Sequence, residues 1–132
     1  DWGLVNTGEG TGWVSLRYLE RQPGQWLGAL PPVATCAGTE PFWSLDLERE
    51  QLSYRTPEAE TRRYALAQSG PARGRRDRFH LRGESAEGKV TAVIALRHCS
   101  DGMSSREYGL GVDLLLSGPD FEHLSGCCSL SR

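Results

Sequence analysis

Residues 78–98 read RFHLRGESAEGKVTAVIALRH, and this stretch decides the class of fold. Apolar and polar residues alternate through Arg78–Gly83, and a second run of strand length, Lys89–His98, follows the turn residues of Gly83–Gly88. Because successive side chains of a strand point to opposite faces, this pattern indicates two strands joined by a short connection. We therefore predict an antiparallel hairpin here.

Further runs of strand length surround this hairpin, and the breaks between them carry Gly, Pro, Asp and Ser. They are Phe42–Glu48, Leu52–Thr56, Arg63–Gln68, Tyr108–Ser117 and His123–Leu130. About seven strands with short connections predict an all-β fold, either a small antiparallel β-barrel or a sandwich, because both limit the exposed edges of a sheet.

The first residues have a different pattern. Trp2–Asn6 and Trp13–Leu19 are expected to be two short strands around the Gly-rich turn Thr7–Gly12. A stretch rich in Pro and Gly follows, within which the apolar residues Trp26, Leu27 and Leu30 are expected to contact a neighbouring surface. The predicted organisation is a hairpin fragment at residues 1–22, a connector at 23–35 and a β-domain at 36–132.

Composition excludes several classes of protein. The formal net charge is −2, so no overall positive field favours nucleic acid. Nothing approaches the roughly 18 consecutive apolar residues that a membrane-spanning helix needs, so no transmembrane segment is expected. The chain begins at Asp1 without a signal-peptide pattern, and we expect any export signal to lie outside this sequence.

Four cysteines are the sharpest compositional feature: Cys36, Cys99, Cys127 and Cys128. An even number in a small domain favours disulfides and an oxidising compartment, periplasmic or otherwise extracytoplasmic. A structural zinc site instead needs close ligand pairs such as C-x-x-C. Here the only close pair is adjacent, and adjacent residues on a strand point to opposite faces. We therefore expect no metal and no cofactor.

Residues 2–19 resemble the end of a bacterial SH3 (SH3b) domain. The shared pattern is Trp2-Gly3-Leu4-Val5, the glycine-rich turn, Gly12-Trp13-Val14 and the closing Tyr18-Leu19. SH3b domains often bind cell-wall peptides or other extracytoplasmic ligands. Only the last part of such a domain is matched, so the resemblance implies an envelope setting and transfers no binding site. An ordinary hairpin that contacts the main domain is the alternative.

Residues 36–128 resemble a family of uncharacterised exported bacterial proteins and lipoproteins. Two motifs carry the resemblance: Gly38-Thr39-Glu40-Pro41-Phe42-Trp43, similar to a G-x-E-P-F-W pattern, and Cys99-Ser100-Asp101-Gly102-Met103-Ser104 with the late Gly126-Cys127, similar to C-x-D-x-M-S…G-C. The family implies no particular activity. By analogy of shape alone it lies near exported barrels such as lysozyme inhibitors.

The same resemblance implies a bond between Cys99 and Cys127, which leaves Cys36 to pair with Cys128. The opposite orientation of Cys127 and Cys128 agrees, because each then meets a different partner. Loop-closure entropy assigns about 3.5 kcal/mol to the shorter loop and about 4.5 kcal/mol to the longer one.

The Cys99–Arg106 loop is the main candidate for binding, because a constrained loop on a stable scaffold is a common place for recognition. It offers Ser100, Asp101, Met103, Ser104 and Arg106. The alternative is a self-satisfied turn, in which Asp101 and Ser104 bind backbone amides and Met103 fills the barrel mouth.

Glu40 and Trp43 are added as candidates from the first motif. We favour a structural role for both, with Glu40 accepting hydrogen bonds from the loop or pairing with Arg106, and Trp43 filling the barrel floor.

Arginines between Thr61 and Phe79 form a second candidate, with Arg75 and Arg76 at its centre. They suit an anionic partner, although a solvated hairpin tip is the more usual explanation of such a run. Apart from Tyr64, no aromatic residue is interleaved with these arginines, which argues further against nucleic acid.

No catalytic residue is assigned. His80, His98 and His123 form no persuasive array with Ser and Asp, and a disulfide-bonded Cys99 serves neither as nucleophile nor as a copper ligand. The expected function is non-catalytic: an extracytoplasmic binding or accessory module that recognises a protein or cell-envelope component, including as a subunit of an envelope complex. A lysozyme-inhibitor-like protein and an accessory region of a cell-wall hydrolase are the alternatives.

Overall fold

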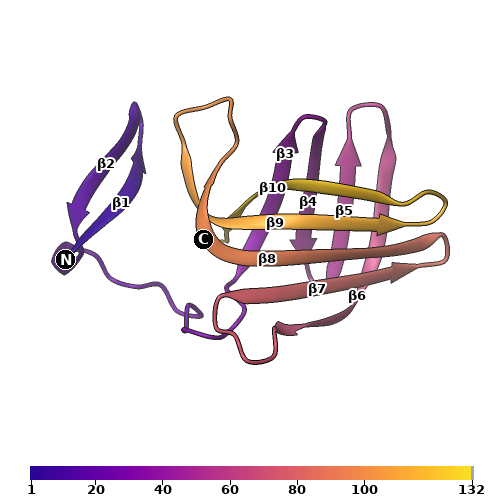
Figure 1. Ribbon diagram of the computed structural model, residues 1–132, viewed down its shortest axis with the longest axis horizontal. Coiled ribbons are helices and arrows are strands. Elements are labelled where there is room, and N and C mark those ends of the chain that lie inside the picture. The colour runs from indigo at the N-terminus through magenta and orange to yellow at the C-terminus, as the bar shows by residue number, and fades with distance from the viewer. Residues whose placement is uncertain (132) are drawn as a thin grey trace.

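A computed structural model describes residues 1–131 as an all-β chain, in which a two-stranded sheet precedes a closed barrel (Figure 1). The first sheet pairs β1 (Trp2–Thr7) with β2 (Gly10–Ser15), and a short 3-10 helix, η1 (Leu16–Tyr18), follows. The barrel strands are β3 (Val33–Thr39), β4 (Phe42–Glu48), β5 (Gln51–Thr56), β6 (Ala59–Pro71), β7 (Arg78–Ser85), β8 (Gly88–Ser100), β9 (Glu107–Ser117) and β10 (Glu122–Leu130). No helix within residues 1–131 is long and apolar enough to cross a membrane.

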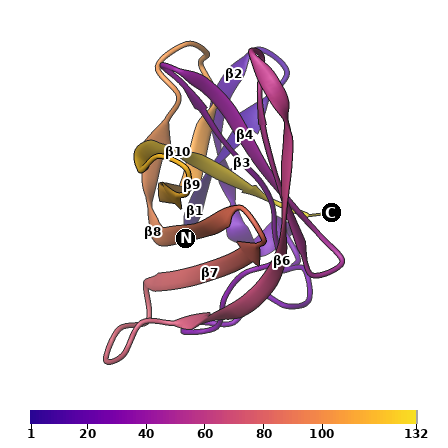
Figure 2. The ribbon, with the colours of Figure 1, turned by 90° about the vertical axis from the view of Figure 1, so that its right-hand side faces the viewer.

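Every neighbouring pair in the barrel is antiparallel, in the order β10-β3-β4-β5-β6-β7-β8-β9. The predicted all-β antiparallel barrel is therefore confirmed, with eight strands. β3 to β6 run across the direction of β7 to β10 in Figure 1, and Figure 2 shows the two sets on opposite sides of the barrel. The long strand β6 joins the two sets and has a register irregularity between Leu66 and Gln68.

The eighth strand was missed. β3 begins at Val33, inside the range expected to be connector, and closes the barrel between β10 and β4. Its residues are mostly small and follow two prolines, so its buried face shows little hydrophobic pattern.

Two features of the N-terminal region also differ from expectation. The turn of the first hairpin is shorter than predicted, because Gly10 and Gly12 pair with Thr7 and Val5 instead of lying in the turn. Leu16–Tyr18 forms η1 instead of continuing the strand. Its Leu16 amide donates to the carbonyl of Asp1 at 2.9 Å, and the Leu16 side chain lies directly over Gly3.

The centre of the barrel is filled by apolar side chains from all eight strands. The largest fully buried ones include Phe79, Leu52, Leu81, Ile94 and Leu114. Leu30 and Leu130 contact this core from its margin, so the expected contact of Leu30 is confirmed. Trp26 and Leu27 are instead 72% and 75% exposed, and the same expectation for these two residues is wrong.

Both predicted disulfides are present. Cys36–Cys128 joins β3 to β10 within the core, with 4.0 Å between the Cα atoms. Cys99–Cys127 joins the end of β8 to β10, with 5.8 Å between the Cα atoms. The two bonds leave β10 from opposite faces, as the alternation of a strand requires.

Candidate functional site

The loop between β8 and β9 is held at three points. At its start, the Cys99–Cys127 disulfide joins the loop to β10. The Thr39 hydroxyl on β3 donates a hydrogen bond to the Asp101 carbonyl at 2.9 Å. At its far end, the Asn6 amide of the N-terminal hairpin donates to the Glu107 carbonyl and accepts from the Glu107 N–H, both at 2.8 Å. The loop therefore stands between the barrel and the hairpin with few ways to move (Figure 1).

Inside the loop, the polar groups bind one another. The Asp101 carboxylate accepts from the backbone N–H groups of Met103 and Ser104, each at 2.9 Å, and from the Ser104 hydroxyl. These backbone hydrogen bonds hold the pKa of Asp101 below its usual value. Ser100 accepts from the Gly102 N–H, and Ser104 from the Arg106 N–H. The self-satisfied turn is therefore present.

Met103 and Arg106 are the two long side chains of the loop that are exposed. Met103 is 67% exposed at the tip, so the expectation that it fills the barrel mouth is wrong. Arg106 is exposed and makes no ion pair within residues 1–131, although it lies near enough to Asp101 to help lower the pKa of that carboxyl. Binding by these residues stays a prediction.

The packing of Trp43 explains why each of the two motifs has a glycine, Gly38 in the first and Gly126 in the second. It is buried in the core, where its indole lies against Gly38 and Gly126. A Cβ on Gly38 would overlap the indole and approach the Ser125 carbonyl, and one on Gly126 would overlap the backbone of Ala37. The motif glycines therefore make room for a core residue. Trp43 has little surface left to meet a ligand, and its part in binding stays untested.

A polar hollow of about 280 Å³ lies beside the loop and brings several candidates together. Glu40, Ser100 and Asp101 line it with Arg97 and His98, two residues that the sequence did not single out for this site. Glu40 is exposed at the β3–β4 turn and pairs neither with Arg106 nor with any other cation of residues 1–131. His98 instead meets Glu107, with 2.5 Å between Nε2 and Oε2. The hollow suits hydrogen-bonding groups.

A larger apolar groove of about 790 Å³ opens on the other side of the loop. We call it the apolar groove; its main lining residues are Trp26, Leu27, Leu96, Arg106, Tyr108 and Leu130. They come from the connector, β8, the β8–β9 loop, β9 and β10, and the connector is far from the other elements along the chain. No local pattern of the sequence could have predicted this groove. The apolar residues Trp26 and Leu27, unusual in a stretch rich in Pro and Gly, were a partial signal.

Arg75 and Arg76 lie in the β6–β7 turn, at the same mouth of the barrel as the β8–β9 loop. The Leu96 N–H of β8 donates to the Asp77 carbonyl of this turn at 2.9 Å, and Figure 1 shows the turn below that end of the barrel and the loop above it. Arg75 donates two hydrogen bonds to Asp77, at 2.9 and 3.0 Å, and this bonding lowers the pKa of Asp77. The Arg76 side chain lies over Gly28 of the connector. Their role in binding an anionic partner stays a prediction.

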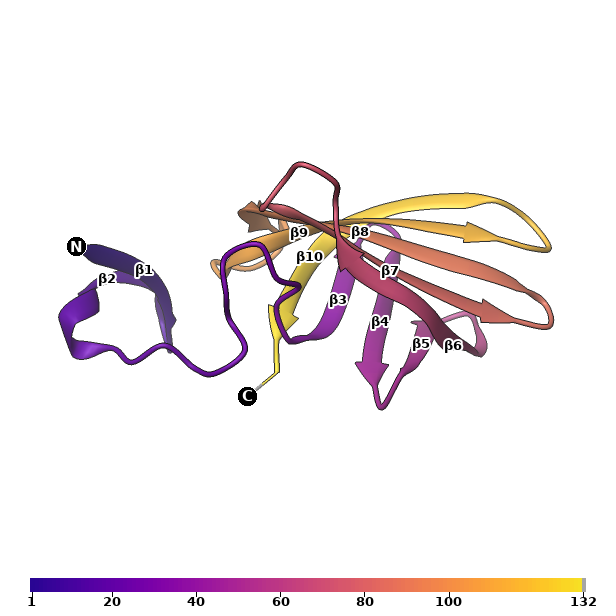
Figure 3. The same ribbon diagram turned by 90° about the horizontal axis from the view of Figure 1, so that it is seen from below.

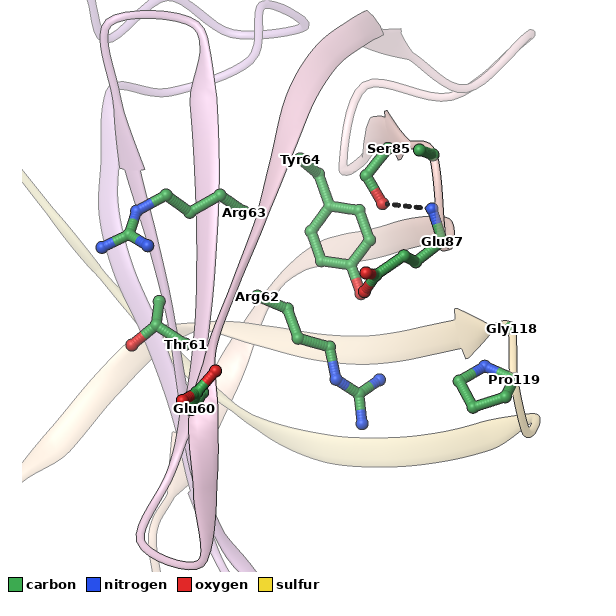
Figure 4. Close-up of a pocket in the computed structure, with 10 residues that line it drawn as sticks. Glu60, Thr61, Arg62, Arg63, Tyr64, Ser85, Glu87, Gly118 and Pro119 are labelled. Atoms are coloured by element: carbon green, nitrogen blue, oxygen red, sulfur yellow. Dashed lines mark hydrogen bonds between the residues drawn. The ribbon is translucent and has the colours of Figure 1, made fainter.

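The far mouth of the barrel holds a polar pocket of about 530 Å³ near the β7–β8 and β9–β10 turns. Figure 4 shows Arg62 extending toward Pro119, while Arg63 points away from the pocket. The Arg62 guanidinium lies 5.6 Å from the centre of the Tyr54 ring. Burial, together with the nearby carboxylate of Glu122, raises the pKa of Tyr54. Glu60 and Glu87 also line the pocket, so its charge is mixed.

Comparison with known proteins adds no assignment. No protein-family model matches the chain, and neither a curated protein nor a solved structure does. Any function must therefore be inferred from the geometry of this chain.

Proposed function

We propose that this chain is an extracytoplasmic, non-catalytic binding module that recognises a protein or cell-envelope component at the end of the barrel where the β8–β9 loop stands. The observation that carries the proposal is the restraint of that loop: a disulfide, the Thr39 bond and the Asp101 turn hold it, while Met103 stays exposed at its tip. A preorganised loop loses less entropy on binding than a flexible one.

The two disulfides support the compartment, because such bonds persist in oxidising environments. The resemblances of residues 2–19 to SH3b domains and of residues 36–128 to exported bacterial proteins agree with the same setting. A subunit of an envelope complex is one form of this function.

The test is affinity isolation from a bacterial envelope extract with the whole chain as bait. We expect Met103→Glu to lose the specific partner, because a charge at the loop tip opposes an apolar contact there. Lys89→Glu, an exposed residue near the start of β8 at the far mouth of the barrel, is the matched control and should keep it. Equal recovery with both variants would remove the loop from the proposal.

Inhibition of a lysozyme is a narrower version of the same proposal. It is favoured by one observation: the loop projects beyond the barrel and ends in the exposed Met103, a shape that suits insertion into a cleft (Figure 1). Its check is a cell-wall lysis assay with a large excess of the chain. Undiminished lysis would exclude this version and leave the broader one standing.

A further inference from the structure

Strands β9 and β10 separate at the apolar groove. Their ladder ends at the pair Leu110 and Cys128, after which Ser129 and Leu130 continue beside β3 alone. β9 extends three residues further on its side, from Glu107 to Gly109, without a partner from β10. Figure 3 shows β10 turning away from β9 toward the C-terminus. Within residues 1–131, this notch interrupts the pairing of the two strands.

Asn6 already fills one position of this edge. Its side-chain amide both donates to and accepts from the backbone of Glu107, which is the pairing that a residue of an added strand would make. The outward-facing backbone groups of Glu107 therefore bond a group that lies outside the barrel, and Asn6 occupies this position. Tyr108 and Gly109 come next along the same strand, and a Cβ placed on Gly109 meets nothing within 4 Å.

The floor of the notch is apolar. Leu110 and Cys128 belong to the core cluster, and Leu130 contacts it. Leu96 has the same parity as the buried Ile94 on β8, and it is 40% exposed at this mouth of the barrel. Trp26 and Leu27 form the opposite wall and leave the groove open. An apolar side chain that entered here would rest on the barrel core.

The rim of the groove carries positive charge. Arg21 and Arg106 line it, and both are exposed and make no ion pair within residues 1–131. The lining also holds one carboxylate, Glu107, whose Oε2 lies beside Nε2 of His98. The two cations outnumber the one carboxylate of the lining and therefore favour an occupant that brings its own acidic groups.

From these features we infer that the apolar groove receives an extended acidic peptide segment of a protein partner, which adds a short strand beside Tyr108 and Gly109. One apolar side chain of the segment lies against Leu96 and Leu130, and a neighbouring carboxylate reaches Arg106 or Arg21. Strand addition to an open edge combines main-chain hydrogen bonds with side-chain pockets in this way. An aliphatic lipid would fill the floor but leave the strand edge unused. The inference rests on the proposed function and names its partner chemistry.

The test uses a phage-displayed library of random peptides, panned on the whole immobilised chain. We expect selected peptides to share an apolar residue flanked by Asp or Glu. Binding of a synthetic, fluorescently labelled winner is then measured by anisotropy. Arg106→Glu, Arg21→Glu and Leu96→Asp should each weaken binding by about tenfold or more, whereas Lys89→Glu, at the far mouth of the barrel, should not.

Two results would overturn the inference. One is a set of winners without acidic residues, or winners that bind all the groove variants as tightly as the wild type. The other is saturable uptake of a fluorescent fatty acid that Leu96→Asp abolishes, with no peptide selected, which would assign the groove to a lipid. The circular dichroism spectrum of each variant must match that of the wild type for its binding to count.

Recovery of the envelope partner by the loop and groove variants distinguishes this inference from the proposed function. If Met103→Glu loses that partner while Arg21→Glu and Leu96→Asp keep it, the peptide inference fails and the proposed function stands. If no variant of the loop or the groove changes recovery, both fail.

Discussion

The barrel and the N-terminal hairpin are both antiparallel β-structure, yet they are held in opposite ways. The barrel has no free sheet edge along most of its circumference, a filled core and two disulfides. The hairpin is a separate two-stranded sheet that exposes Trp2 by 67% and Trp13 by 68%. Because an isolated two-stranded hairpin is marginal in water, the comparison teaches that closure and cross-linking, not strand pairing alone, make this fold stable.

The largest effect is expected from removing the disulfides, which only the barrel has. Cys36→Ala combined with Cys128→Ala opens a loop with a sequence separation of 92 and should lower the free energy of unfolding by about 4.5 kcal/mol. Removing Cys99–Cys127, with a separation of 28, should cost about 3.5 kcal/mol. Denaturant unfolding followed by circular dichroism measures both. The reverse order of the two losses would show that loop entropy does not control them.

Alternation along a strand predicts that Cys127 and Cys128 face opposite sides and find separate partners, but it does not say which partner each one takes. The bond between Cys99 and Cys127 was implied by the resemblance of residues 36–128 to exported bacterial proteins. The strand Phe42–Glu48 was found with its observed limits, because its alternation is clean. β3 was not, because the buried face of Val33–Thr39 depends on small residues whose partners lie on β10 at the other end of the chain.

The candidate site divides in the same way. The turn around Asp101 follows from its Asp, Gly and Ser residues, which bind backbone groups close by. The apolar groove joins Trp26, Leu96 and Leu130, and the polar hollow joins Glu40 and Arg97. Their proximity results from barrel closure, which no segment of the sequence encodes alone.

A pair of glycines tests how tightly each region is packed. Gly38→Ala in the barrel places a Cβ against the Trp43 indole and should destabilise the fold by about 1–3 kcal/mol. Gly8→Ala at the hairpin turn is the matched control, since nothing lies within 4 Å of its Cβ. Thermal unfolding compares the two variants. A loss for Gly8→Ala as large as that for Gly38→Ala would contradict the contrast between the regions.

A smaller effect is expected where the hairpin meets the barrel. Asn6→Ala removes both hydrogen bonds to Glu107 and should cost about 1–2 kcal/mol, most of it local to the junction. Hydrogen exchange should quicken in β1 and β2 and stay unchanged in β7. Thr11→Ala, at the exposed position that pairs with Asn6, serves as the control. Unchanged exchange in the hairpin would mean that other contacts hold it.

The smallest effect is expected from lowering the pH, which protonates Asp101. The β8–β9 loop then transmits the change to the N-terminal hairpin. The pKa of Asp101 lies below the usual aspartate value of about 4, because the amides of Met103 and Ser104 bind its carboxylate. Its stabilisation is therefore complete above pH 4 and is lost as the pH falls through the lowered value. We expect the amide resonances of Met103 and Ser104 to shift in that window, followed by those of Glu107 and the hairpin, while core resonances such as Ile94 stay constant. Asp101→Asn should abolish the shift. If the core resonances moved together with the loop, the two regions would be one cooperative unit and the comparison would fail.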